Sequence, residues 1–190
     1  MGSVTDNVIT AIVDNRTKFE AFCRSLTPEQ LDRPVPDSSW VVRDFAAHLA
    51  TLDPALVQNF QATARGEKFT GPDGAESFDL DGMNDALVAE RRSWPLDRVF
   101  EEAAANRAPL IDALRAITDE QAQNQMWFGG DAKRSAGFVP FNLFLAGWAQ
   151  HDPIHAADML KALPELAADA ETTAWVENPF VKGYQAMMNH

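Results

Sequence analysis

The stretch Trp40–Leu49, WVVRDFAAHL, places His48 among the apolar positions of a predicted helix. That helix is expected to begin near Ser39 and to run to about Arg65, because apolar residues recur in it at helical spacing. Its inward positions are Val41, Phe45, His48, Leu52, Leu56 and Phe60. An imidazole on a buried face needs a partner, since an unsatisfied buried polar group costs about 1–3 kcal/mol. His48 is therefore a candidate for chemistry.

Two further histidines occur in a later helix, which is expected over Phe138 to Leu163. His151 and His155 are four residues apart, so both imidazoles leave the same face of that helix. If this face meets that of His48 across a core, the three rings converge. Three neutral imidazoles can bind one divalent cation and leave a coordination position open, which is typical of a catalytic metal site. The alternative is a solvated or hydrogen-bonded histidine pair without a metal.

Helical periodicity dominates the rest of the chain, and no convincing strand pattern appears. One helix is expected over Thr5 to Leu26 and another over Met83 to Ile117, kinked or split near Trp94 by Pro95. Two long connections, residues 66–82 and 118–137, separate the helices. We therefore predict an all-α four-helix bundle in residues 1–163 and a short helical C-terminal extension in residues 164–190.

The composition excludes several classes of partner. The chain has 190 residues and a formal net charge of −12, which argues against nucleic acid and against an anionic membrane surface. No apolar run approaches the ~20 residues of a membrane helix, and the N-terminus lacks the pattern of a signal peptide. Cys23 is the single cysteine, so no intrachain disulfide can form, and we expect its thiol to pack rather than to react. A cytoplasmic location is expected.

Two distant motifs carry a resemblance to a known family. Leu26–Pro34 followed by Trp40–Leu49 resembles the opening of the DinB-like superfamily, and Trp148–Asp158 fits its late motif, His or Glu, three residues, then His. Within the superfamily, the sequence is most similar to the metal-binding domain of mycothiol-dependent maleylpyruvate isomerases. The resemblance covers most of residues 5–163. It implies an up-down-down-up four-helix bundle that holds a divalent metal on His48, His151 and His155.

The resemblance also implies an activity. It points to a metal-dependent enzyme that uses a low-molecular-weight thiol such as mycothiol, as an S-transferase or isomerase acting on a small molecule. Imidazole ligands suit Zn, Ni or Fe. The isomerases carry a separate C-terminal domain where this sequence has a short extension, so maleylpyruvate itself is not the expected substrate. Relatives are often dimers, which leaves a homodimer open.

Two alternatives to that activity remain. Three histidines by themselves equally allow a metal-dependent hydrolase. A non-catalytic module that binds a metal or a small ligand, or that is associated with stress, is also consistent with the sequence, because a fold does not determine a function.

Four side chains near the histidines are candidates for supporting roles. A metal-bound histidine usually donates its second N–H to a carboxylate or carbonyl. Asp44, one turn before His48, and Asp152 and Asp158, beside the late pair, could accept it; alternatively they are capping or surface carboxylates. Trp148 either walls the site or packs in the core.

Other positions raise questions of local structure. Val41 cannot cap the helix that follows it, so either Ser38 or Ser39 is expected to cap the helix or its start is frayed. Pro153 lies between the two late histidines and is expected to bend their helix. Lys133 and Arg134 could bind a carboxylate at the mouth of the site, although a solvated loop is the favoured interpretation.

Overall fold

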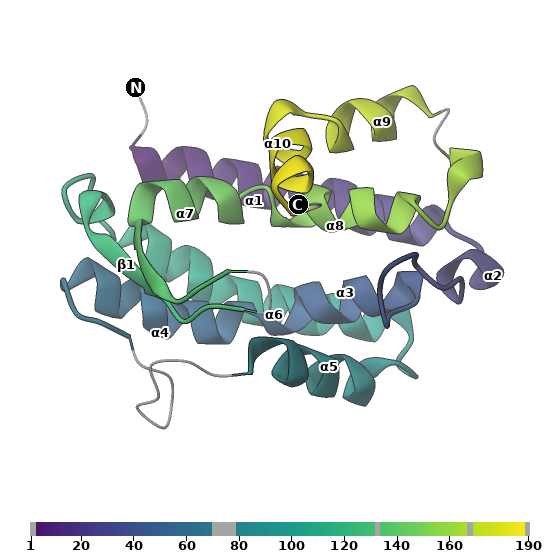
Figure 1. The fold of residues 1–190 in the computed structure, drawn as a ribbon, viewed down its shortest axis with the longest axis horizontal. Helices are drawn as coiled ribbons and strands as arrows, with labels where there is room; N and C mark the ends of the chain where they lie inside the picture. The colour runs from purple at the N-terminus through teal and green to yellow at the C-terminus, as the bar shows by residue number, and fades with distance from the viewer. Residues whose placement is uncertain (1–2, 70–78, 132–133, 167–168, 189–190) are drawn as a thin grey trace.

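The fold is a helical bundle. The computed structural model describes residues 3–69, 79–131, 134–166 and 169–188. Within these residues, four helical rods form the bundle: α1 (Val4–Ser25), α3 (Val42–Thr51) with α4 (Asp53–Ala64), α6 (Leu96–Arg115), and α7 (Phe141–Trp148) with α8 (His151–Leu160). Figure 1 shows α1 and α7–α8 running in one direction and the other two rods in the opposite direction. The predicted all-α bundle and its up-down-down-up order are confirmed.

The helix expected over residues 39–65 is interrupted. It consists of α3 and α4, which meet at Leu52. Pro54 lies in the first turn of α4, where its missing N–H leaves no intrahelical bond unmade. The prediction of one continuous helix was wrong at this point, because Pro54 lies at the start of a second helix, α4.

The helix expected over residues 138–163 is also interrupted, but not at its proline. α7 ends at Trp148 and α8 begins at His151, so Pro153 lies in the first turn of α8. The first four N–H groups of a helix have no intrahelical acceptor, and Pro153 therefore removes no hydrogen bond. The expected bend at Pro153 is corrected to a break before His151, which leaves both late histidines on one regular helix.

The predicted split near Trp94 is confirmed. α5 (Leu80–Arg91) packs along α3, and the chain reverses before α6 begins at Leu96. Arg91 stabilises this reversal, because it donates hydrogen bonds to Glu102 of α6 through Nε (2.6 Å) and Nη2 (2.8 Å). α5 is thus an addition to the outside of the bundle (Figure 1).

A short hairpin was not predicted. β1 (Gln125–Phe128) pairs in antiparallel register with β2 (Gly137–Pro140), with Met126 opposite Val139. Each strand has four residues, which is too short for alternation along the sequence to stand out. The minor helices are α2 (Pro28–Leu31), η1 (Gln121–Gln123) and η2 (Pro164–Leu166).

The core has two parts, and the histidines lie where these parts meet. One apolar cluster is built around Phe19, Phe45 and Met159, and the other around Phe60 and Phe141. The chain leaves the second cluster at Ala149 and joins the first at Ala156, so the two late histidines lie between them. Polar rings at such a junction are desolvated on several sides.

The C-terminal extension packs on its own chain. α9 (Ala170–Val176) and α10 (Pro179–Met188) both contact α8, and Val176 and Val181 are buried. Trp175 packs against the first apolar cluster. The division into residues 1–163 and 164–190 stays a prediction, as does a homodimer.

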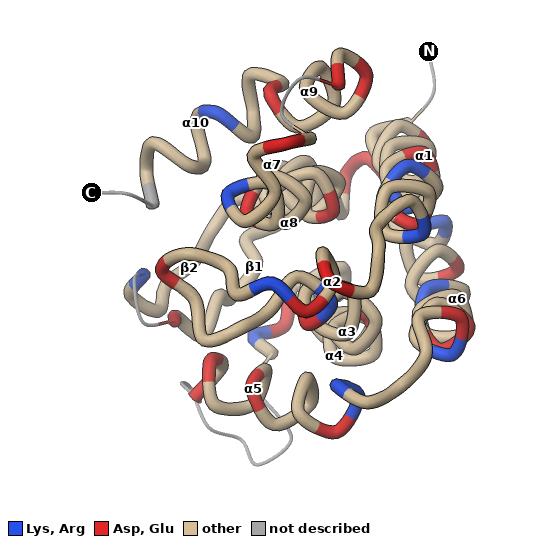
Figure 2. The backbone as a smooth tube through the Cα atoms, turned by 90° about the vertical axis from the view of Figure 1, so that its right-hand side faces the viewer, with Lys and Arg blue, Asp and Glu red and all other residues tan. Residues whose placement is uncertain are grey.

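The surface and the helices show two further features. Lys and Arg are interspersed with Asp and Glu along the described helices (Figure 2). Among the described residues, every helix is too short or too polar to span a membrane.

Candidate metal centre

Three histidines converge between α3 and α8. His48 comes from α3, and His151 and His155 come from one face of α8. One ring nitrogen from each lies within 4.8 Å of the others. The ring centroids are 4.9 Å apart for His48 and His155, and 5.5 Å apart for His48 and His151. The structure thus brings together the three rings that the sequence placed on two facing helices.

The two late histidines touch directly. The Nε2 atoms of His151 and His155 are 2.9 Å apart. At that distance, one nitrogen must carry a proton and the other a lone pair. A cation between them would replace this hydrogen bond by two metal–nitrogen bonds.

Burial keeps two of the rings neutral. Desolvation lowers the pKa of His48 well below its usual range, and the nearby His155 adds to this effect. Desolvation likewise lowers the pKa of His151, with smaller contributions from His155, His48 and the cations Arg107 and Arg16. Neutral imidazoles have the lone pair that a metal requires.

The Nδ1 atoms of the three rings are incompletely satisfied. In the described part of the chain, the buried Nδ1 atoms of His48, His151 and His155 have no hydrogen-bond partner of good geometry. Asp158 Oδ2 lies 3.4 Å from Nδ1 of His155, within ion-pair range but without hydrogen-bond alignment. Asp158 is thus the candidate carboxylate that the structure does bring to a histidine.

Asp44 has other partners. Its carboxylate is buried and accepts two hydrogen bonds from Arg92, at 2.8 and 3.1 Å. It also accepts from the backbone N–H of Val41 at 3.1 Å, which stabilises the start of α3. The expectation that Ser38 or Ser39 caps this helix was wrong, because the N-cap is Val41 and Asp44 supplies the side-chain oxygen.

Asp152 also faces away from the rings. Its two carboxylate oxygens accept from Nε (2.8 Å) and Nη2 (3.0 Å) of Arg16, which belongs to α1. The structure therefore brings Asp152 to a guanidinium rather than to His151, its neighbour in sequence.

Aromatic rings wall the cluster. The ring of Trp148 lies 4.3 Å from that of His151. Trp40 lies 4.9 Å from His48, and Phe45 lies 5.5 Å from His155. Trp40 and Phe45 were not among the predicted site residues, although Phe45 shares the apolar stripe of His48 and could have been found by its spacing.

Three other candidates lie elsewhere. Arg134 pairs with Asp131 of its own loop and covers the ring of Phe128, while Lys133 lies outside the described residues. Cys23 is completely buried, and this burial raises the pKa of its thiol. Such a thiol is packed in the core and poorly nucleophilic.

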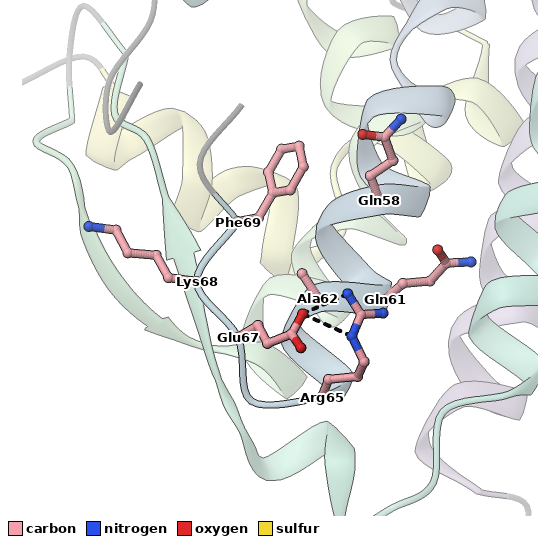
Figure 3. A pocket seen from close by; sticks show the side chains of 7 residues that line it. All are labelled: Gln58, Gln61, Ala62, Arg65, Glu67, Lys68 and Phe69. Carbon is pink, nitrogen blue, oxygen red and sulfur yellow. Dashed lines mark hydrogen bonds and ion pairs between the residues drawn. The ribbon is translucent and has the colours of Figure 1, made fainter. Parts of the chain in front are cut away.

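A separate pocket opens at the C-terminal end of α4 (Figure 3). Arg65 and Glu67 pair with each other there. It is lined by Gln58, Gln61, Ala62, Arg65, Glu67, Lys68 and Phe69. None of the three clustered histidines lines this pocket.

Fold and site together define a helical-bundle protein with a three-histidine cluster between two helices, in which His48 is buried and the other two rings are half-buried. The family described as mycothiol maleylpyruvate isomerase N-terminal domain matches residues 13–151, and the chain belongs to that family. The match includes His48 and ends at His151.

Solved structures agree on the fold. The chain resembles a crystal structure of the mycothiol-dependent maleylpyruvate isomerase, with a TM-score of 0.58, 16% identity, and coverage of 89% of this chain and 72% of the other. A histidine-to-alanine mutant of that enzyme gives a TM-score of 0.58 and 15% identity over the same shares of the two chains. No curated protein matches the sequence.

Proposed function

We propose that this protein is a metal-dependent enzyme that uses a low-molecular-weight thiol, such as mycothiol, in S-transfer or isomerisation of a small molecule. His48, His151 and His155 would hold the divalent cation. The observation that carries the proposal is the convergence of three ring nitrogens within 4.8 Å, from two helices that are far apart in sequence.

The residues fit a divalent cation in number and chemistry. Three nitrogen donors suit Zn, Ni or Fe, and small side-chain rotations would bring them to the ~2.0–2.1 Å of a zinc–nitrogen bond. The pKa values of His48 and His151 are lowered, so these rings are available as lone-pair donors at neutral pH. A bound cation of this kind lowers the pKa of a coordinated thiol or water and so makes a nucleophile available near neutral pH.

The surrounding residues have distinct roles in this proposal. Trp40, Phe45 and Trp148 surround the rings and exclude water from their faces, which strengthens electrostatic interactions in the site. Asp158 would accept the Nδ1 proton of His155 and thereby keep Nε2 of that ring free to bind the cation. With three protein ligands, a coordination position stays available for substrate.

Family membership supports the thiol. The matching family and both structural relatives are named for mycothiol, and a mycothiol-like thiol is therefore the first cosubstrate to test. We propose further that the enzyme works in the cytoplasm, and that a homodimer is one form it takes.

The test measures metal content and thiol consumption in the same preparations. The full chain is purified without a histidine tag, its metals are measured by mass spectrometry, and a panel of thiols is offered with electrophiles. His48→Ala should abolish both metal binding and turnover. Gln61→Ala, in the pocket that none of the three histidines lines, should abolish neither.

Other outcomes point elsewhere. Bound metal with ester or amide hydrolysis, and no thiol consumption, would favour a hydrolase. Bound metal with neither reaction would favour a binding module. Absence of metal after reconstitution with Zn²⁺, Ni²⁺ and Fe²⁺ would overturn the proposal.

A further inference from the structure

We propose that Arg16 is a positioning residue that holds the two histidine-bearing helices at the spacing a shared cation needs. Arg16 belongs to α1, which contributes no histidine to the cluster. The inference rests on the proposed function, because it concerns the same three-histidine centre.

The contacts of Arg16 reach both helices next to their histidines. Its guanidinium donates to both oxygens of Asp152, the residue that follows His151 in α8. Nη2 also donates to the carbonyl oxygen of Leu49 at 3.2 Å, and Leu49 follows His48 in α3. One planar group therefore links α8 and α3 at the residues adjacent to two of the three converging rings.

Because this link is buried, it favours one relative position of α3 and α8. The side chains of Arg16 and Asp152 are only 11% and 5% exposed. In such surroundings each buried charge is stabilised by its partner. A shift of either helix would break hydrogen bonds and leave a charge without a partner. The guanidinium presents its donors in a rigid fork, whereas a lysine ammonium is a single point charge. Lysine can keep the charge of Arg16 but cannot reproduce its three bonds.

Asn15, the residue before Arg16 in α1, forms hydrogen bonds near the start of α8. Asn15 donates through Nδ2 to the carbonyl oxygen of Ala149 at 2.6 Å, at the break that precedes α8. Its Oδ1 accepts from Nε1 of Trp175, in the C-terminal extension, at 2.9 Å. Asn15 and Arg16 together fix where α8 begins and how it faces α3, so the ring spacing depends on α1 as well as on the two helices themselves.

The test compares two arginine-to-lysine variants of the full chain. Arg16→Lys retains the charge opposite Asp152. Arg91→Lys is the matched control, because Arg91 also makes two bonds to one carboxylate, that of Glu102, and one to a backbone carbonyl, that of Leu87, with 12% of its side chain exposed. Arg91 makes one further bond, to the carboxylate of Glu90. The hydrogen bonds of Arg91 lie within α5 and between α5 and α6, and none of those described reaches α3 or α8.

Two measurements are made on each variant. Titration with Co²⁺, followed by its visible absorption, should show affinity about tenfold or more weaker for Arg16→Lys, the range seen when residues that support a metal ligand are removed. Arg91→Lys should match the unsubstituted protein in affinity and spectrum. Without metal, NMR should show ring-proton contacts between His48 and His155 in the unsubstituted protein and in Arg91→Lys, and weakened contacts in Arg16→Lys.

Equal Co²⁺ affinity and unchanged ring contacts in Arg16→Lys would overturn the inference, even if its melting temperature fell as far as that of Arg91→Lys. Failure of the proposed function would give a different experimental result. If the unsubstituted protein bound no Co²⁺, the metal centre would be wrong, while selective loss of the ring contacts in Arg16→Lys would still establish that Arg16 positions the histidines.

Discussion

Nε2 of His151 lies 2.9 Å from Nε2 of His155, on one face of α8. Two neutral imidazoles can adopt this contact only if one N–H donates a hydrogen bond to the other ring. That bond uses the lone pair of the accepting nitrogen. The contact therefore competes with a cation for the nitrogens that would bind it. Because the break before His151 leaves the pair on a regular helix, the four-residue spacing alone brings the rings this close.

Replacement of His151 by glutamate should preserve metal binding. A carboxylate is also a divalent-metal ligand, and Arg16 and Arg107 exert positive charge on this position. We expect His151→Glu to bind Zn²⁺ within about tenfold of the original affinity, whereas His151→Ala should lose about 100-fold or more. Isothermal titration would measure both. Unchanged affinity in both variants would show that position 151 is not a ligand.

Replacement of Asp158 by asparagine should weaken metal binding. Asp158 lies 3.4 Å from Nδ1 of His155, and its charge makes that ring a stronger donor. We expect Asp158→Asn to lower Zn²⁺ affinity about tenfold. The control is Asp112→Asn, which breaks a comparable pair three residues apart, with Arg115, on an exposed surface. If both variants bound Zn²⁺ equally well, Asp158 would have no part in the site.

Replacement of Asp44 by alanine should destabilise the fold without changing metal affinity. Its buried carboxylate accepts from Arg92 and from the Val41 N–H, so its loss removes charged hydrogen bonds and a helix cap. We expect the free energy of unfolding to fall by about 2–4 kcal/mol in urea titrations. Asp112→Ala, at an exposed site, should change little. A loss of Zn²⁺ affinity in folded Asp44→Ala would instead place Asp44 in the metal centre.

The metal-free protein should lose stability below neutral pH. The pKa values of His48 and His151 are lowered in the folded state, while unfolded histidines titrate near 6.5. Between these values the unfolded chain binds more protons, so the free energy of unfolding decreases as the pH falls below about 6.5. Urea titrations in chelator at pH 7.5 and 5.5 should reveal the decrease, and His48→Phe should reduce it. A flat profile would contradict the pKa shifts.

Much of the centre could be predicted from local spacing. A helix repeats every ~3.6 residues, so residue spacing predicts that His48 shares a helix face with Phe45, and that His151 shares one with His155. The family was instead predicted from the resemblance of the paired motifs, and the family match confirms it. Stripes of this kind must be buried, and burying them against each other brings the rings together.

The partners of the carboxylates depended on tertiary structure. Asp44 and Asp152 lie on the histidine helices themselves. Their carboxylates nevertheless accept hydrogen bonds from Arg92 and Arg16, which are distant in sequence. The break before His151 likewise depends on packing, with Asn15 bonded to Ala149 at the break. Local sequence determines which face of a helix is buried, but a buried charge pairs with whichever opposite charge the packed chain brings to it, and only the assembled bundle decides which one that is.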